Sequence, residues 1–317
     1  MALIEVNHLK KYFDVAKGTL HAVDDVSFEI EEQTTLGVVG ESGCGKSTLG
    51  RTLLRMENPT SGEILYRGQD ITKCSRREMK KMRTKLQMIF QDPYSSLDPR
   101  LSITQLIEEP LIIHKIYSSK EEREKRVNEL MDTVGIARRY AHSFPHELDG
   151  GRRQRVGIAR ALALDPEFIV CDEPVSALDV SIQAQVINLL EDLQQEKKLT
   201  YMFITHDLSV VRYISDEICV MYLGRVVEKC KSDELFNNTL HPYSQALLGA
   251  VLEPKLKKDR TVTLMKGELT SPIDPKPQCR FADRCPHVCE ECLAREPELR
   301  EVRPGHLVAC HLVKAEA

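Results

Sequence analysis

The chain has 317 residues, of which 42% are hydrophobic and 29% are charged, with 44 basic and 48 acidic residues and a formal net charge of -4. This size allows one large domain with an appendage, or two modest domains. The charge balance gives no support for a nucleic-acid-binding protein, which usually carries a basic excess. No apolar run approaches the length of a membrane-spanning helix, and the first residues lack the regions of a signal peptide, so we expect a cytoplasmic protein.

The N-terminal part predicts strands, followed by a strand, a loop and a helix. Residues 3–8 and 25–30 alternate like the two strands of an antiparallel pair. Residues 35–40 form a short apolar run that ends in glycine, and a polar, glycine-rich loop leads into a helix that begins at Lys46. Residues 86–90 predict a further buried strand.

Helices dominate the middle of the chain. Apolar spacing predicts helices over residues 103–115 and 120–134, and a third over 157–164 that runs into Asp165-Pro166. The stretch from about 92 to 160 therefore interrupts the alternation of strands and helices, and we expect it to form a helical subdomain.

Alternation resumes after this stretch. Residues 168–171 and 200–204 predict strands on either side of an amphipathic helix over 181–196. Strands that alternate with helices imply a mainly parallel sheet. Residues 231–278 contain five prolines and little periodicity, so we predict a connector there.

The loop after the strand at 35–40 carries a phosphate-binding pattern. Residues 40–47 fit G-x-x-x-x-G-K-[ST] at every position. Glycines let backbone N–H groups turn toward phosphates, Lys46 supplies a point charge, and the Ser47 hydroxyl can bind Mg²⁺. A chance glycine turn is the alternative, but the flanking strand and helix are the context that the motif requires. The predicted nucleotide-binding residues of this loop are Gly40, Glu41, Ser42, Gly43, Cys44, Gly45, Lys46, Ser47 and Thr48.

Two carboxylates end the predicted strand at 168–171. Asp172 would hold Mg²⁺, and Glu173 would orient and polarise an attacking water molecule. The alternative is that either residue only caps a following helix. A carboxylate pair after a strand is weak evidence alone, but it becomes strong when a phosphate loop lies upstream.

With these motifs in order, the first 230 residues resemble the ATP-binding cassette (ABC) ATPases. Gln91 matches the glutamine that senses Mg²⁺ and the attacking water in that family, and His206 matches its switch histidine. Residues 176–179 resemble the D-loop, which reaches the second nucleotide-binding subunit. Phe13 aligns with the aromatic residue that stacks on adenine, with Tyr12 as a second candidate. The resemblance implies ATP and Mg²⁺ as cofactors, with Mg²⁺ held by Ser47, Gln91 and Asp172.

Residues 148–154, Leu-Asp-Gly-Gly-Arg-Arg-Gln, resemble the family's LSGGQ signature but depart from it. Asp149 replaces a serine that donates to the γ-phosphate of the partner's ATP, and Gly150 and Gly151 follow it. An ionised carboxylate has no proton to donate and repels phosphate. Arg152 could neutralise Asp149 by an i,i+3 pair or contact the phosphate itself. Because Asp is also a good helix N-cap, we expect intact structure with altered chemistry. The resemblance therefore implies a heterodimer with one degenerate ATP site.

Three stretches narrow the family further. Residues 90–100 and 144–148 are similar to sequences in the ATPases of dipeptide and oligopeptide importers, and residues 241–248 resemble their C-terminal extension. The cysteine-bearing sequence from Gln278 to Cys310 agrees with the same group.

Five of the ten cysteines lie in the last forty residues. In a reducing cytosol this clustering favours a metal or iron–sulfur site over disulfides. The importer resemblance implies a [4Fe–4S] cluster on Cys279, Cys285, Cys292 and Cys310. Cys289 forms C-x-x-C with Cys292, which on spacing alone would suggest zinc, and free thiols are a third reading.

The sequence thus predicts an α/β, RecA-like P-loop NTPase core with an antiparallel β subdomain, an inserted helical subdomain and a cysteine-rich C-terminal extension. We place the nucleotide-binding domain at 1–230 and the extension at 231–317. The expected function is ATP hydrolysis that powers peptide import, at the cytoplasmic face of the membrane. The expected partners are a second ABC ATPase subunit, two membrane permeases and, indirectly, an extracellular or periplasmic peptide-binding protein. Import of nickel or another small solute, or a soluble regulatory ABC protein, are the alternatives.

Overall fold

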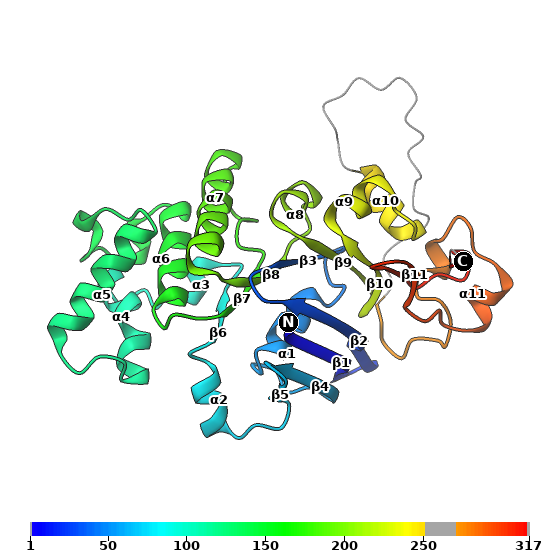
Figure 1. Ribbon diagram of the computed structural model, residues 1–317, viewed down its shortest axis with the longest axis horizontal. Coiled ribbons are helices and arrows are strands. Elements are labelled where there is room, and N and C mark those ends of the chain that lie inside the picture. The colour runs from blue at the N-terminus through cyan, green and yellow to red at the C-terminus, as the bar shows by residue number, and fades with distance from the viewer. Residues whose placement is uncertain (1, 251–270, 316–317) are drawn as a thin grey trace. The chain divides into compact units, whose positions relative to one another are not determined.

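The computed structural model describes residues 2–250 and 271–315, which fall into two compact units (Figure 1). The first unit combines Met1–Ile30, Thr35–Thr72 and Thr205–Ala317. The second unit combines Glu31–Thr34 with Lys73–Ile204. The chain thus leaves the first unit and returns to it.

The first unit contains an antiparallel sheet and a mixed sheet. The antiparallel sheet has the order β2-β1-β4-β5, with β1 (Ala2–Val15), β2 (Gly18–Glu31), β4 (Ser61–Tyr66) and β5 (Gln69–Asp70). The first two strands are much longer than the predicted 3–8 and 25–30, because a two-residue turn joins them into one long hairpin.

The mixed sheet carries the phosphate loop. The first unit contributes five strands to this sheet: β3 (Thr35–Val39), β9 (Glu217–Tyr222), β10 (Arg225–Lys231), β12 (His306–Val308) and β11 (Arg300–Arg303). The β3–β9 pair is parallel, and the pairs that follow it are antiparallel. Every residue of β3 is buried, which is typical of a strand covered on both faces.

The helices of the first unit are α1 (Lys46–Leu53), α8 (Leu208–Ile214), α9 (Ser232–Asn237), α10 (Pro242–Ala250) and α11 (Glu290–Ala294). The stretch predicted as a connector over 231–278 thus begins with the two helices α9 and α10. Pro242 is the first residue of α10, where a missing N–H costs the helix nothing. Residues 251–270 lie outside the described residues.

The end of that predicted connector is fixed to the hairpin. Leu20 and Ile273 form an antiparallel bridge, and the His21 N–H donates to the Pro272 carbonyl at 2.9 Å. The C-terminal region from residue 271 onward is therefore part of the same compact unit as β1 and β2.

The second unit contains three parallel strands and the middle helices. Its strands are β6 (Leu86–Ile89), β7 (Phe168–Asp172) and β8 (Thr200–Ile204). Its helices are α2 (Arg76–Met82), α3 (Pro93–Ser96), α4 (Ile103–His114), α5 (Lys120–Thr133), α6 (Gly150–Leu162) and α7 (Val180–Lys197). Figure 1 shows α4, α5 and α6 packed together, in agreement with their contacts.

Sequence signals explain two of these helices well. Ser102 with Gln105 and Ser119 with Glu122 form capping boxes at the starts of α4 and α5, close to the predicted boundaries. The helix predicted at 157–164 overlaps the end of α6, which begins at Gly150, the start that the capping preference of Asp149 predicted. Within the described residues, no helix is long and apolar enough to cross a membrane.

Candidate functional site

The loop between β3 and α1 has the backbone that phosphate binding requires. Gly45 precedes the helix with φ +104°, and a Cβ there would lie 2.0 Å from the Ala22 carbonyl oxygen. A Cβ at Gly40 would lie 2.2 Å from the Met221 carbonyl oxygen. A larger residue at either position would therefore clash with the backbone of Ala22 or Met221 and displace the loop. Because Gly45 has no side chain to cap α1, the first N–H groups of that helix suit an anion.

Lys46 lies beneath this loop. The residue is 4% exposed, and its ammonium group donates to the carbonyl oxygens of Gly40 at 2.8 Å and Glu41 at 3.0 Å. These hydrogen bonds hold the Lys46 side chain against the loop, so its ammonium group lies beside the backbone of Gly40 and Glu41. Ser42 and Gly43 are exposed, and Ser47 and Thr48 are half-buried in the first turn of α1.

The predicted catalytic carboxylate lies in the second unit and is bonded to the predicted glutamine. Gln91 donates from its amide nitrogen to a carboxylate oxygen of Glu173 at 3.0 Å. Glu173 has φ +45°, a left-handed conformation that non-glycine residues adopt rarely, and its N–H donates to the Ile204 carbonyl at 2.9 Å. Asp172, the last residue of β7, is 1% exposed. The structure therefore brings Gln91 and Glu173 together.

The proposed Mg²⁺ ligands have suitable chemistry. A serine hydroxyl, an amide oxygen and a carboxylate are hard oxygen donors, which Mg²⁺ prefers. Asp172 is a buried carboxylate at the end of β7, a position from which a carboxylate can bind a cation. Ser47 belongs to the first unit and Gln91 and Asp172 to the second, so their meeting around one ion stays a prediction.

The altered signature forms an intact helix start. Asp149 is the N-cap of α6, accepting from the Arg152 N–H at 2.8 Å, and its second carboxylate oxygen pairs with the Arg152 guanidinium. That guanidinium also lies over the Tyr140 ring, 5.0 Å from its centroid. A Cβ at Gly151 would lie 2.4 Å from Ile182 in α7, so the second glycine is needed for close packing. The i,i+3 pair expected from the sequence is present.

The two aromatic candidates for adenine stacking differ in their surroundings. The Tyr12 ring stacks on His21 with centroids 3.9 Å apart, and its hydroxyl donates to Asp24. Phe13 is half-buried, with the Lys11 ammonium 4.4 Å from its ring centroid. Because Tyr12 already has a stacking partner, Phe13 remains the better candidate.

His206 directly precedes Asp207, the N-cap of α8, and is exposed. It lies in the first unit, together with the phosphate loop. Its role as the switch histidine stays a prediction, as do the roles of the other motif residues.

The iron–sulfur prediction is wrong. Among the residues that the structure describes, no group of three or more His, Cys, Asp or Glu side chains is arranged to hold a metal ion. In the metal-free chain, burial raises the pKa of Cys279 to about 12 and that of Cys292 to about 11. The Cys292 sulfur lies 3.3 Å from the sulfur of Cys289, a residue outside the predicted ligand set. Cys285 and Cys310 therefore also lose their predicted role as cluster ligands.

Sequence reasoning missed two residues at the phosphate loop. The Glu41 N–H donates to the Tyr243 hydroxyl at 2.9 Å, and the Glu41 carboxylate pairs with Arg284 at 2.6 Å. Both partners come from the C-terminal region, more than 200 positions away in the sequence. No local sequence motif predicts these contacts, because the residues meet only in the folded chain.

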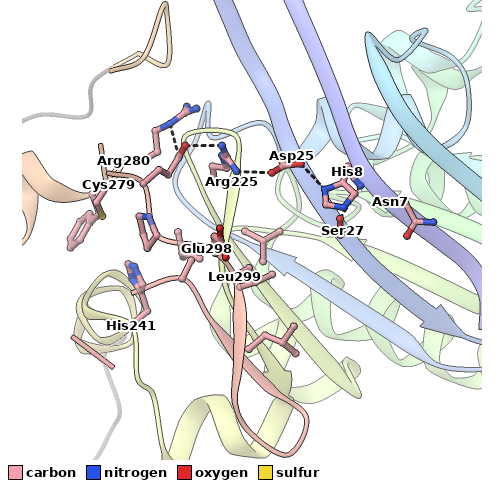
Figure 2. Close-up of a pocket in the computed structure, with 17 residues that line it drawn as sticks. Asn7, His8, Asp25, Ser27, Arg225, His241, Cys279, Arg280, Glu298 and Leu299 are labelled. Atoms are coloured by element: carbon pink, nitrogen blue, oxygen red, sulfur yellow. Dashed lines mark hydrogen bonds and ion pairs between the residues drawn. The ribbon is translucent and has the colours of Figure 1, made fainter. Parts of the chain in front are cut away.

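A cavity of about 660 Å³ lies between the hairpin and the C-terminal region of the first unit (Figure 2). Ion pairs run from Arg280 through Glu296 and Arg225 to Asp25, which is hydrogen-bonded to His8. Because these side chains are paired with one another, the cavity has fewer charged groups available to bind a ligand than the phosphate loop has.

Comparisons with known proteins agree with this geometry. The profile described as "ABC transporter" matches residues 23–176, and that of the "oligopeptide/dipeptide transporter, C-terminal region" matches residues 227–292. The chain is 51% identical to the putative oligopeptide transport ATP-binding protein YkfD of Bacillus subtilis, over 99% of this chain and 96% of that protein. It is 49% identical to the dipeptide transport ATP-binding protein DppF of Escherichia coli, over 98% of this chain and 94% of the relative.

Solved structures match the same fold. The dimeric ATP-binding cassette MJ0796, bound to ADP and phosphate in a post-hydrolysis state, is 31% identical with a TM-score of 0.67. The match covers 72% of this chain and 98% of that structure. The cassette cbiO1 of Clostridium perfringens matches 75% of this chain and 91% of its own at 29% identity, with a TM-score of 0.67. The α/β prediction is thereby confirmed at the level of the cassette fold.

Proposed function

Since this chain belongs to the ATP-binding cassette family of ABC transporters, we propose that it hydrolyses ATP to drive import of dipeptides or oligopeptides through partner membrane permeases. The observation that carries the ATPase activity is the phosphate loop, with Lys46 buried beneath it at the start of α1. The peptide cargo rests on relatives at about half identity along almost the whole chain, which are named as oligopeptide and dipeptide transport ATP-binding proteins. No observation favours nickel import or a soluble regulatory role.

The chemistry follows from the residues in place. The loop N–H groups and Lys46 bind the outer phosphates, and Glu173 polarises the water that attacks the γ-phosphorus atom in line. The bond from Gln91 orients the Glu173 carboxylate. Mg²⁺, held by Ser47, Gln91 and Asp172, would neutralise charge on the phosphates when bound. His206 and Phe13 would contact the γ-phosphate and the adenine.

We assign the nucleotide-binding domain to residues 1–230, with an antiparallel β subdomain and a helical subdomain at about 92–160, and the extension to 231–317. The helical subdomain would transmit closure of the cassette pair to the permeases. Two permeases, at whose cytoplasmic face this chain would lie, and an external peptide-binding protein complete the system.

The altered signature supports a heterodimer with one degenerate ATP site. In a cassette pair each ATP lies between the phosphate loop of one subunit and the signature of the other. Asp149 offers a carboxylate where a hydroxyl donor is needed, and a like charge 4 Å from a phosphate costs about 4 kcal/mol at a protein surface. The pair with Arg152 offsets part of this repulsion. The site built on this chain's own Lys46 and Glu173 keeps its complete set of residues.

This proposal predicts the effect of restoring the signature. The double change Asp149→Ser with Arg152→Gln should raise the ATP turnover of the assembled transporter up to about twofold, because a second site becomes competent. ATP turnover of the complex purified with its permeases, with and without di- and oligopeptides, is the measurement. The exposed change Arg295→Gln serves as a control. An unchanged rate, or an isolated chain as fast as the complex, would refute the asymmetric heterodimer.

A further inference from the structure

Glu41, the second residue of the phosphate loop, has all three of its polar groups bound. Its carbonyl accepts from the Lys46 ammonium at 3.0 Å. Its N–H donates to the Tyr243 hydroxyl at 2.9 Å. Its carboxylate accepts two bonds from Arg284, at 2.6 Å and 3.0 Å. Two of these three attachments therefore come from the C-terminal region rather than from the loop itself.

The residues that hold Glu41 are themselves fixed. Arg284 is 7% exposed, and the adjacent Glu41 carboxylate raises the pKa of its guanidinium above the usual value. Behind it, the rings of Tyr222, Tyr243 and Phe281 contact one another, with centroids 4.6 to 5.4 Å apart. Phe281 and Arg284 lie on the same short segment, so this aromatic cluster sets the direction of the guanidinium. A bidentate pair in such surroundings is directional as well as strong.

The loop next to Glu41 has little packing of its own. Ser42 and Gly43 are exposed, and a Cβ added at Gly43 would meet no described atom within 4 Å. The conformation at this end of the loop is therefore determined by Glu41 and its partners, together with the turn bond from the Cys44 N–H to the Glu41 carbonyl at 3.3 Å. A phosphate-binding loop that is already ordered spares ATP the entropic cost of ordering it.

We propose that the C-terminal region sets the ATP affinity of this chain by holding the phosphate loop through Glu41, with Arg284 and Tyr243 as positioning residues. The inference rests on the proposed ATPase function and adds a role for the region beyond the cassette. Arg284 fixes the carboxylate and Tyr243 fixes the N–H, so the Glu41 carbonyl keeps its place against Lys46. Loss of either attachment lets the loop sample conformations in which its N–H groups no longer converge.

The neighbouring Arg280 provides a contrast within the same segment. It pairs with Asp24 and Glu296 and donates to the Leu223 carbonyl, without contacting the phosphate loop. If the C-terminal region acted only by general stabilisation, removing either arginine would have the same effect. If it acts through Glu41, only Arg284 matters for nucleotide binding.

The test is binding of a fluorescent ATP analogue with Mg²⁺ to the full chain, together with KM and kcat of the assembled transporter. Arg284→Gln should raise both Kd and KM about tenfold and leave kcat within about twofold, which is the effect of losing one charge-assisted pair. Arg284→Lys should recover part of the affinity, because the charge remains. Arg280→Gln and the exposed Arg295→Gln should bind like the wild type.

A double-mutant cycle locates the effect. If Arg284 acts through Glu41, then Glu41→Gln weakens binding by a similar factor and the double variant is little worse than either single one. Tyr243→Phe, which removes only the hydroxyl, should weaken binding about threefold. Multiplicative effects of the two single changes would overturn the proposal.

Thermodynamic linkage between ATP binding and this contact gives a second measurement, which would not change if Arg284 only stabilised the fold. If release of Arg284 from Glu41 weakens ATP binding tenfold, bound ATP must suppress that release by the same factor. Amide hydrogen exchange next to Arg284 and Glu41 should then slow up to about tenfold on ATP binding in the wild type, and not in Arg284→Gln. Wild-type protein that binds no ATP would refute the proposed function itself. Wild-type binding with an unaffected Arg284→Gln, or an equal loss in Arg280→Gln, would overturn only the inference.

Discussion

Glu173 combines a functional carboxylate with a backbone conformation that costs free energy. Its φ of +45° is stabilised by the N–H bond to Ile204, and its side chain is oriented by Gln91. Strain of this kind persists where the surrounding structure enforces it. The geometry agrees with a carboxylate that acts on a substrate rather than one that caps a helix.

Replacing Glu173 with glutamine should therefore separate binding from chemistry. Glu173→Gln keeps the shape and an acceptor for Gln91 but cannot polarise water as a carboxylate does, so kcat should fall at least about 100-fold. ATP affinity should stay within about threefold of the wild type. ATP turnover and binding of a fluorescent analogue check both parts, and a kcat within tenfold of the wild type would contradict the assigned role.

At this scale the sequence predicts residues that act through local motifs and misses those that act at a distance. Lys46 and Ser47 follow from glycine spacing between a strand and a helix. Tyr243 and Arg284 reach Glu41 only through tertiary folding, so no spacing rule can find them. The cysteines failed for another reason: the family resemblance implied a cluster, whereas the described residues contain no group of side chains arranged to hold a metal ion.

Among the elements, α6 shows that a capping residue can start a helix where the amino-acid composition does not favour one. Apolar spacing predicted a helix only over 157–164, whereas the capping preference of Asp149 predicted a helix start near Gly150. The structure begins it at Gly150, because Asp149 caps the first turn and α7 packs on Gly151. The same reasoning explains α10, where the proline taken as a helix breaker occupies the first helical position.

The cap makes a prediction about stability. Asp149→Ala should lower the free energy of unfolding by about 1 kcal/mol, whereas Asp149→Ser, which keeps an acceptor, should change it by only a few tenths. Urea unfolding followed by circular dichroism makes the comparison. Equal effects of the two substitutions would show that the Asp149 bond to Arg152 does not support the helix.

In the whole molecule, the order of motifs along the chain predicted the family, and the family predicted the cassette fold. The division into units was less accessible, because the second unit is inserted into the first and the C-terminal region returns to the hairpin at Leu20. The same region covers His241, which is 2% exposed and packs against the Phe281 ring with centroids 5.9 Å apart.

Burial of His241 gives the folded protein a specific response to acid. Burial lowers the pKa of His241 to about 4, below the unfolded value of about 6.5. The unfolded chain therefore takes up this proton first, so stability is complete above pH 6.5 and falls as the pH drops toward 4. The loss should reach about 2 kcal/mol at pH 5.

Urea unfolding of the wild type and His241→Gln from pH 7.5 to pH 4.5 isolates this contribution, since other titrating groups are common to both. The variant should be less stable at neutral pH and should approach the wild type as the pH falls. A constant difference over the whole range would mean that another group carries the acid response.

The outermost strand of the mixed sheet has a consequence for solubility. β11 is short and has charged side chains at Arg300, Glu301 and Arg303, which discourages another chain from adding to that edge. Removing the region after residue 230 would strip β11 and β12 from β10 and uncover a strand that contains Val226 and Val227. The cassette core alone should therefore self-associate, and the last residues of the chain protect it from aggregation.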